Sequence, residues 1–335
     1  MKSAVLHGPR SLRVQAAPAP EPAAGEALVR VAIAGLCGTD YSIFSGERPV
    51  GYPRVMGHEF VGRVDAVGSG VTTPRVGDRV AVEPNYSCGA CPLCREGNRN
   101  LCLTRTAIGI DVDGCFAELV RVPAQCCWPA PAGVADEDLM VTEPLAVVVR
   151  AAARAQVRSG EATAVVGAGT LGLLALQVLR AHGARVLAVS RSARRLALAR
   201  ELGVEATYAS AETASLEDVG REFSRREGVD CVVETAGTAE AVADALRLVR
   251  PGGRVVLTGL PHEPTPVRFF SVVRREISIL GSMIYQDEFA EAMQLVAAGQ
   301  VRTRPLITHH FALHEIERAF AVHREPSSIK IALTP

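Results

Sequence analysis

The sequence is short of lysine, of aromatic residues and of net charge. Lysine occurs only at Lys2 and Lys330, and aromatic residues make up 4% of the 335 residues. Lys+Arg and Asp+Glu are equal at 36 each, so no overall positive field exists to concentrate nucleic acid or an anionic membrane surface. These absences argue against nucleic-acid and membrane partners. They favour a small neutral molecule as the ligand.

Long apolar runs are also missing. No stretch approaches the roughly 18 apolar residues of a membrane span, and the first residues lack the apolar core and cleavage site of a secretory signal. We therefore expect an intracellular, cytoplasmic protein. Its nine cysteines should stay reduced and serve as metal ligands or as small buried side chains.

Four of these cysteines follow one another closely at C-x2-C-x2-C-x7-C spacing: Cys88, Cys91, Cys94 and Cys102. Four thiolates at such spacing can enclose one zinc ion in a closed structural site. Chance clustering or two disulfides is the alternative, and nothing else in the chain suggests secretion. A zinc-finger nucleic-acid binder is disfavoured, because net charge is zero and no basic helix follows the cluster.

The residue composition and the predicted secondary-structure pattern change near residue 148. Residues 1–147 are rich in Gly and Pro and contain short β-type runs, which predicts a β-rich, barrel-like domain. Residues 148–284 alternate apolar strands with helical patterns, which predicts an α/β domain with a doubly wound, six-stranded parallel sheet. An amphipathic helix at 288–299 opens the last segment, 285–335. The predicted strands of the sheet are 162–167, 185–190, 206–209, 229–235, 253–259 and 277–282.

The first of these strands runs into a G-x-G-x-x-G turn that a helical pattern follows. In this context the glycines allow a tight turn, close approach of a pyrophosphate and close packing of helix on strand. An ordinary glycine-rich turn is the alternative. We expect a dinucleotide to bind the turn through Gly167, Gly169, Thr170, Leu171 and Gly172.

The second strand ends without the acidic residue that would accept a hydrogen bond from a free ribose 2′-hydroxyl. It ends in Ser190 and Arg191, and Arg195 follows one turn later. A small hydroxyl beside guanidinium groups leaves room and positive charge for a 2′-phosphate, which favours NADP(H) over NAD(H). The alternative is that these arginines only solvate the start of a helix.

Three further segments carry residues suited to metal chemistry: Cys37-Gly-Thr39-Asp40, His58-Glu59 and Glu143. Each is weak evidence alone, since a single Cys or His is usually a core or surface residue. The remaining histidines, His262 among them, lack ligand-like spacing.

Taken together, these motifs resemble the zinc-dependent medium-chain dehydrogenases of the alcohol dehydrogenase superfamily, most of all their sorbitol and threonine dehydrogenase branch. The resemblance covers essentially the whole chain and implies a GroES-like fold for the β-rich domain. It implies a catalytic zinc held by Cys37, His58, Glu59 and Glu143, besides the structural zinc. The turns that carry Thr235, Gly259 and Leu260 resemble the family's ribose- and nicotinamide-lining turns.

The same resemblance implies a hydride transfer between a secondary alcohol (of a polyol, a cyclitol or an amino alcohol) or its ketone and NADP(H). Thr39 would contact the reacting oxygen and begin a proton relay, and Asp40 would orient His58. Ser42 stands where the family commonly has the histidine that ends this relay. The alternative for Glu143 is that its carboxylate has no metal to bind and only interacts with the dipole at the N-terminus of a helix.

Two expectations concern the whole protein. Relatives pair through the last strand of the nucleotide domain, so a homodimer or homotetramer is expected. The alternative to an enzyme is a non-catalytic nucleotide-binding or regulatory protein that has kept the fold and the structural zinc.

Overall fold

The computed structural model describes residues 1–210, 215–261 and 263–335, so His262 lies outside the described residues. The chain divides into two compact units. The first comprises Met1–Glu143, Ala292–Ala297 and Thr303–Pro335, and the second comprises Pro144–Glu291 and Ala298–Arg302. Within the described part of the chain, no helix has the length and apolarity needed to cross a membrane.

β-Sheets form the centre of the first unit. The largest, with seven strands, contains β3 (Glu26–Leu36), β5 (Glu59–Val67), β6 (Arg79–Val82), β9 (Leu119–Pro123), β10 (Cys127–Pro129), β17 (Ile307–Ala312) and β18 (Lys330–Thr334). Its order is β10-β6-β5-β3-β18-β17, and β9 also pairs with β3. Two smaller sheets consist of β1 (Lys2–Leu6), β2 (Leu12–Ala16) and β4 (Arg54–Val55), and of β7 (Asn85–Tyr86) and β8 (Thr106–Ala107).

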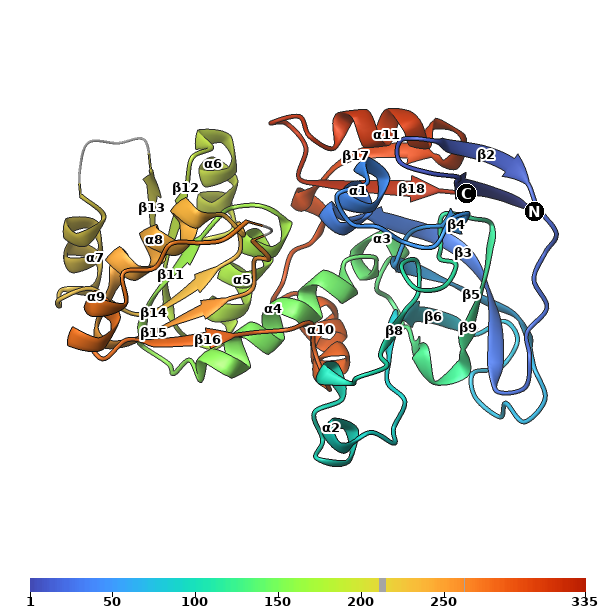
Figure 1. Ribbon diagram of the computed structural model, residues 1–335, viewed down its shortest axis with the longest axis horizontal. Coiled ribbons are helices and arrows are strands. Elements are labelled where there is room, and N and C mark those ends of the chain that lie inside the picture. The colour runs from blue at the N-terminus through green and yellow to red at the C-terminus, as the bar shows by residue number, and fades with distance from the viewer. Residues whose placement is uncertain (211–214, 262) are drawn as a thin grey trace. The chain divides into compact units, whose positions relative to one another are not determined.

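The strand β3 organises this unit, because it is buried along most of its length and has neighbours on both sides. Its end pairs antiparallel with the start of β5, where Gly35 lies opposite Glu59. On its other side, Leu36 lies opposite Ile331 of β18, so the last strand of the chain runs beside one of the first (Figure 1). The segments around residues 36, 59 and 330 therefore meet, although they are far apart in the sequence.

The second unit contains a six-stranded, all-parallel sheet. It consists of β11 (Ala162–Val166), β12 (Arg185–Ser190), β13 (Ala206–Ala209), β14 (Val229–Glu234), β15 (Val249–Leu257) and β16 (Ser278–Gly281). The order is β13-β12-β11-β14-β15-β16. The chain adds strands first to one side of β11 and then to the other, as in doubly wound nucleotide-binding sheets. The six predicted strands are confirmed. The strand β15 begins earlier than predicted, because Val249 pairs with Val229 before a bulge in the ladder.

Helices connect the strands of this sheet. The helices α5 (Thr170–Ala181) and α6 (Ala193–Glu201) contact β11, β12 and β13, while α7 (Leu216–Ser224) and α8 (Ala239–Leu248) contact β14. The predicted helix at 288–299 is α10 (Glu288–Ala297), after which Gly299 turns the chain at φ +67°. The other helices are α1 (Gly38–Ser45), α2 (Pro92–Arg95), α3 (Asp136–Leu139), α4 (Thr142–Ala155), α9 (Phe269–Arg274) and α11 (Ile316–Val322).

Candidate metal centres and nucleotide site

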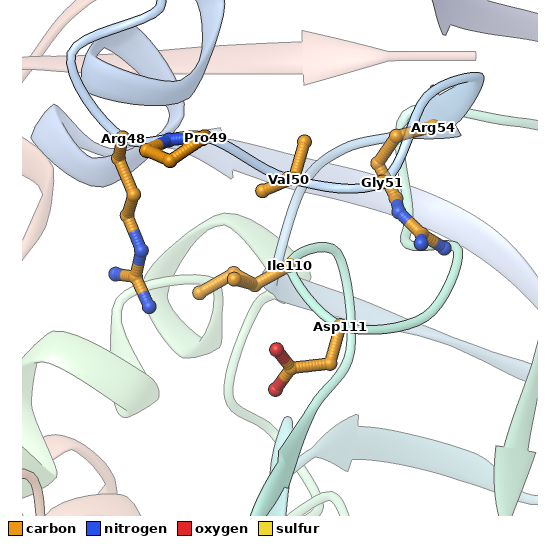
Figure 2. Close-up of a pocket in the computed structure, with 7 residues that line it drawn as sticks. All are labelled: Arg48, Pro49, Val50, Gly51, Arg54, Ile110 and Asp111. Atoms are coloured by element: carbon orange, nitrogen blue, oxygen red, sulfur yellow. The ribbon is translucent and has the colours of Figure 1, made fainter.

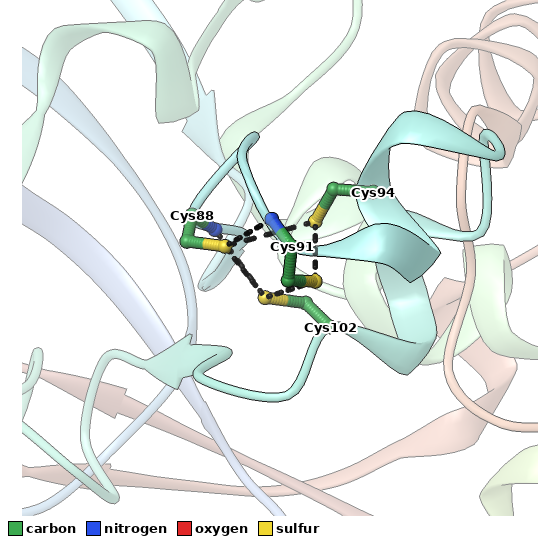
Figure 3. Close-up of side chains that lie close together, drawn as sticks. All are labelled: Cys88, Cys91, Cys94 and Cys102. Carbon is green, nitrogen blue, oxygen red and sulfur yellow. Dashed lines mark hydrogen bonds between the residues drawn. The ribbon is translucent and has the colours of Figure 1, made fainter.

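The four clustered cysteines lie close together in the first unit (Figure 3). Their Sγ atoms are separated by 3.5 Å (Cys91 to Cys94 and Cys88 to Cys102) and by 4.0 Å (Cys88 to Cys94 and Cys91 to Cys102). A tetrahedral zinc with bonds of about 2.3 Å needs sulfur atoms about 3.8 Å apart. These distances fit a zinc ion and are far too long for disulfides, whose S–S bond is about 2 Å.

Backbone amides also favour the thiolate form of Cys88, whereas burial raises the pKa of Cys94 to about 11. The N–H groups of Ala90 and Cys91 point at Cys88 Sγ at 3.4 and 3.3 Å. Led by the bond from Ala90, such contacts lower the pKa of Cys88 to about 6. A thiolate is the form of cysteine that binds metal. The loop therefore offers a ligand that is already ionised near neutral pH.

A second group of possible metal ligands lies at the ends of β3 and β5. Ligand atoms of Cys37, His58 and Glu59 all lie within 4.8 Å of one another. Cys37 follows β3 directly, His58 precedes β5, and Glu59 is its first residue. His58 and Glu59 are buried, while Cys37 is partly exposed. A thiol, an imidazole and a carboxylate around one point form a donor set that suits zinc.

Asp40 connects the two ligand-bearing segments. Its fully buried carboxylate accepts hydrogen bonds from Cys37 N (2.9 Å) and Gly57 N (3.3 Å). Its Oδ1 atom lies 3.3 Å from His58 Nδ1, an ion-pair distance without the alignment of a hydrogen bond. Burial by itself lowers the pKa of His58, but Asp40 and Cys37 outweigh burial and raise it. Asp40 therefore lies beside the imidazole ring of His58, and its role in orienting that ring stays a prediction.

Glu59 has a partner that sequence reasoning missed. Lys330 Nζ lies 2.8 and 2.5 Å from the two carboxylate oxygens of Glu59 and 3.3 Å from Leu36 O, and both side chains are buried. The Glu59 side chain passes over the backbone of Gly35 to reach β18. A Cβ atom added to Gly35 would lie 2.2 Å from Glu59 Oε2. Glycine at position 35 is therefore required for this ion pair. Only the pairing of the first strands with the last strand brings these residues together.

Glu143 lies in the first turn of α4 and is 8% exposed. Burial raises its pKa to about 7. The nearby charge of His58 lowers this pKa, and the charge of Glu59 raises it. Its carboxylate is thus within electrostatic reach of the ligand group without belonging to the set of mutually close ligand atoms. The geometry suits an exchangeable ligand or one that acts through water. Its role remains a proposal.

The expected proton relay has less support than the ligand group. Thr39 and Ser42 both lie on α1 and are partly exposed. Ser42 Oγ donates a weak hydrogen bond to Glu47 at 3.4 Å. A proton passed to Ser42 would therefore meet a carboxylate near the surface, at the position where the resemblance implies a histidine.

The glycine motif of the second unit forms the turn from β11 to α5. Gly167 has φ +99°, and a Cβ on Gly172 would lie 1.8 Å from Gly167 O. A Cβ on Gly169 would meet nothing within 4 Å, which leaves its backbone open to a ligand. The N-terminus of α5 follows this turn, and the N-terminus of a helix favours a bound phosphate. The local geometry fits the pyrophosphate of a dinucleotide.

These two glycines should respond differently to substitution. Gly172→Ala is expected to destabilise the protein by about 2–3 kcal/mol, because the new methyl group overlaps a backbone carbonyl. Gly169→Ala should change stability by less than about 1 kcal/mol and should weaken dinucleotide binding at least tenfold. Thermal unfolding followed by circular dichroism and titration with reduced cofactor would measure both. Equal stability losses would contradict this assignment.

The end of β12 carries the residues expected near the adenosine ribose. Ser190 Oγ accepts a hydrogen bond from Ser192 N (3.2 Å), and Ser192 caps α6 through Arg195 N. Arg191 is exposed. The pKa of Arg195 is lowered by its partial burial and by the neighbouring charge of Arg194. No carboxylate follows this strand directly.

Two turns at the carboxyl ends of β14 and β15 contact each other through backbone atoms. A Cβ on Gly259 would lie 2.2 Å from Gly237 N. Thr235 Oγ1 donates to the carbonyls of Val166 and Gly167 at 3.2 and 3.1 Å, which ties its turn to the glycine motif. Leu260 is 61% exposed. The residues Thr235, Gly259 and Leu260 therefore lie at the sheet edge where doubly wound folds bind ligands.

Glu234, a second residue whose role sequence reasoning missed, holds these turns together. Its fully buried carboxylate accepts hydrogen bonds from Ala236 N (2.6 Å) and Gly237 N (2.7 Å). Its backbone carbonyl accepts from Thr258 N and Gly259 N. The sequence signal was available, since an acidic residue ending an apolar strand is unusual unless it is hydrogen-bonded.

Comparison with known proteins finds similarity to dehydrogenases along the chain. A family described as zinc-binding dehydrogenase matches residues 170–298, and the alcohol dehydrogenase GroES-like domain matches residues 23–132. A sorbitol dehydrogenase of Halalkalibacterium halodurans is 34% identical, with 98% of this chain and 97% of that protein covered. An L-threonine 3-dehydrogenase of Bacillus subtilis is 34% identical, with 95% and 93% covered.

Solved structures show the same similarity over the full chain. A zinc-binding dehydrogenase from Sinorhizobium meliloti 1021 bound to NADP has a TM-score of 0.95 and 34% identity, covering 100% of this chain and 99% of that one. The alcohol dehydrogenase rspB from E. coli CFT073, complexed with NADH, has a TM-score of 0.93, 33% identity and the same coverage. The two cofactors differ, so similarity alone does not choose between them.

Proposed function

Because this chain belongs to the zinc-binding medium-chain dehydrogenases of the alcohol dehydrogenase family, we propose that it oxidises a secondary alcohol, or reduces the matching ketone, with NADP(H). It is a zinc-dependent dehydrogenase that acts on a CH–OH group with a nicotinamide cofactor. The proposal adds the substrate class, a polyol, cyclitol or amino alcohol, and the preference for NADP(H). It also assigns catalysis to residues 1–147 and dinucleotide binding to residues 148–284. Residues 285–335 would form a C-terminal segment that returns to the catalytic domain.

The observation that carries the proposal is the group formed by Cys37, His58 and Glu59. Zinc at this group would act as a Lewis acid that acidifies a hydroxyl, and the nicotinamide would accept the hydride. Other residues of the chain would position these ligands and exchange the proton. Asp40 holds the Cys37 and His58 segments together, and Glu143 places a carboxylate of raised pKa beside them, suited to exchange a proton near neutral pH.

The test is cofactor reduction by zinc-replete protein, followed by ultraviolet absorbance, with NADP+ and NAD+ each offered polyols, cyclitols, amino alcohols and simple secondary alcohols. Turnover on one class would support the proposal and identify the substrate family. Silence across the panel from protein that holds zinc and binds cofactor would instead favour the non-catalytic alternative.

The cofactor preference has its own test. We expect Arg191→Met to weaken NADPH binding about 10- to 100-fold, since a charge-assisted bond to a phosphate contributes about 1.5–3 kcal/mol, and to leave NADH binding unchanged. Ser190→Asp should reverse the preference, because a carboxylate accepts from the 2′-hydroxyl and repels a 2′-phosphate. Fluorescence titration gives both affinities, with Arg200→Met, an exposed arginine on α6, as the control. Tighter binding of NADH by the unaltered protein would refute the NADP(H) preference.

By the same resemblance, we propose a homodimer or homotetramer that pairs through β16. This strand lies at the edge of the six-stranded sheet and pairs only with β15 among the described strands. Equilibrium sedimentation would separate the two states from each other and from a monomer.

A further inference from the structure

The first unit contains a pocket of ≈ 520 Å³ (Figure 2). Two segments of the chain line it, with residues Arg48, Pro49, Val50, Gly51, Arg54, Ile110 and Asp111. None of these residues belongs to a group of possible metal ligands, and the pocket lies outside the unit that carries the glycine motif. The second unit has a different feature, the fully buried Glu234 carboxylate at the carboxyl edge of its sheet.

The Glu234 side chain is held by backbone groups. Its Oε1 atom accepts from Ala236 N and Gly237 N at 2.6 and 2.7 Å, and no cationic side chain pairs with it among the described residues. Burial raises the pKa of this carboxyl, and backbone N–H groups partly offset the rise. A buried carboxylate is unfavourable unless hydrogen bonds compensate it. Its contribution is therefore to the turn at residues 235–237, which directly follows β14.

The turn after β14 contacts both neighbouring turns at this edge of the sheet. On one side, Thr235 Oγ1 donates to the Gly167 carbonyl at 3.1 Å. On the other side, a Cβ on Gly259 would lie 2.2 Å from Gly237 N and 2.7 Å from Glu234 Oε2. Atoms packed so closely cannot shift independently. A change in the Glu234 carboxylate would therefore also affect the turn after β15.

The turns after β11 and β14 offer different groups to a ligand. No side chain caps α5, whose cap residue is Gly169, and an uncapped helix N-terminus favours a phosphate. After β14, by contrast, Glu234 occupies the N–H groups of Ala236 and Gly237, and the Thr238 side chain caps α8. A carboxylate inside the turn also repels a phosphate. The turn after β14 therefore suits an uncharged part of the cofactor.

The order of the sheet indicates which part of the cofactor this is. Ser190 and Arg191, expected near the adenosine ribose, lie at the end of β12, on one side of β11. The turns at residues 235–237 and 258–260 follow β14 and β15, on the other side. A dinucleotide lies across the strand at which such a sheet reverses its order. With the pyrophosphate at the glycine motif, the nicotinamide half is the part that meets these two turns.

We propose that Glu234 is a positioning residue for the nicotinamide half of the cofactor. Its carboxylate holds the turns at residues 235–237 and 258–260 in the arrangement that this half requires, and it contributes nothing to binding of the adenosine half. The inference rests on the part of the proposed function that concerns the dinucleotide. It depends on neither the substrate class nor turnover.

The test compares whole cofactors with their adenosine halves. Zinc-replete protein is titrated calorimetrically with NADPH and NADH, and with adenosine 2′,5′-bisphosphate and AMP as the matching halves. Glu234→Ala should weaken binding of the preferred dinucleotide about 10- to 100-fold, because the hydrogen bonds that fix the turn are lost. Binding of its adenosine half should stay within about twofold, since that half lies across β11 from the substitution.

A conservative variant keeps the test decisive if Glu234→Ala does not fold. Glu234→Gln retains an oxygen that accepts from the same N–H groups, but its bonds are uncharged and weaker. Its loss of dinucleotide affinity should therefore be smaller, about 2- to 5-fold, and again absent for the adenosine half.

Asp230→Asn is the matched control. Asp230 is a buried carboxylate at the other end of β14, where it accepts from Ala162 N at 3.0 Å and pairs with Arg250 at 2.7 Å. Its loss should lower the midpoint of thermal unfolding and leave the affinities for both dinucleotides and both adenosine halves unchanged. A general loss of stability in the second unit is thereby distinguished from a loss of positioning.

The outcomes separate this inference from the proposed function. Equal weakening of a dinucleotide and its adenosine half by the Glu234 variants would overturn the inference, and so would unchanged dinucleotide affinity. If the unaltered protein turns over no alcohol, the proposed function fails, but the titrations still decide the role of Glu234. An unaltered protein that binds neither dinucleotide would overturn both.

Discussion

Replacing Lys330 by methionine is expected to destabilise the first unit by about 3–5 kcal/mol, because the buried Glu59 carboxylate loses the ammonium group that contacts both of its oxygens. Lys330 Nζ contacts both oxygens of this carboxylate, and neither side chain is more than 3% exposed. The pair raises the pKa of Lys330 although burial opposes this. Urea unfolding followed by the fluorescence of Trp128, the only tryptophan and a residue of the first unit, measures the loss.

Two variants make this result interpretable. Lys2→Met removes the only other lysine, which is exposed on β1, and should change stability by less than about 0.5 kcal/mol. Adding Glu59→Gln to Lys330→Met removes both charges and should restore most of the stability, since a buried pair is costly mainly when one partner is missing. If the single and double variants unfold at the same urea concentration, the ion pair is not what stabilises this part of the fold.

Local sequence signals were enough for much of the fold. The strands of the six-stranded sheet could be predicted because each is an apolar run of four or more residues. Each run is flanked by residues typical of turns or helices. The glycine motif was readable for the same reason: β11, the turn and α5 follow one another without interruption. The four cysteines from Cys88 to Cys102 span a single loop, so their spacing alone indicated that their sulfurs could meet.

The contacts around Glu59 could not be predicted in this way. Glu59 and Lys330 are 271 positions apart, and they meet only because β5 and β18 both pair with β3. Gly35 looked like one glycine among 30, and its role follows from the side chain that crosses it. The burial of Glu143, which sets its pKa, likewise depends on tertiary packing rather than on the residues beside it.

The side chains near the ligand group suit a bound cation. Cys37, Asp40, Glu59 and Glu143 are potential anions there, whereas Lys330 and a protonated His58 are the cations that act on them among the described residues. Burying several carboxylates without compensation is unfavourable, and such groups are normally paired or bind a metal. A divalent ion would supply the missing charge where the thiol, imidazole and carboxylate converge. The loss of one ligand should therefore affect both metal content and rate.

We expect Cys37→Ser to lower the zinc content from about two ions per chain to about one and to reduce kcat/KM at least a thousandfold. The reason is that a Lewis acid stabilises the transition state by several kcal/mol, and each 1.36 kcal/mol is about a factor of ten in rate. Elemental analysis and steady-state rates with the best alcohol of the panel measure the two effects. The four-cysteine cluster is a separate group, so it should keep its ion.

Cys127→Ser is the matched control, because Cys127 is a partly buried cysteine of the same unit outside both ligand groups. It should keep about two zinc ions and its rate within a factor of about two. A substitution of Cys37 that merely unfolds the unit would also lower the zinc content, so the fluorescence of Trp128 must stay native. Retention of two ions and near-normal turnover by folded Cys37→Ser protein would remove Cys37 from the catalytic centre. The site would then have to be sought around Glu143 and His58, whose electrostatic coupling does not depend on the thiol.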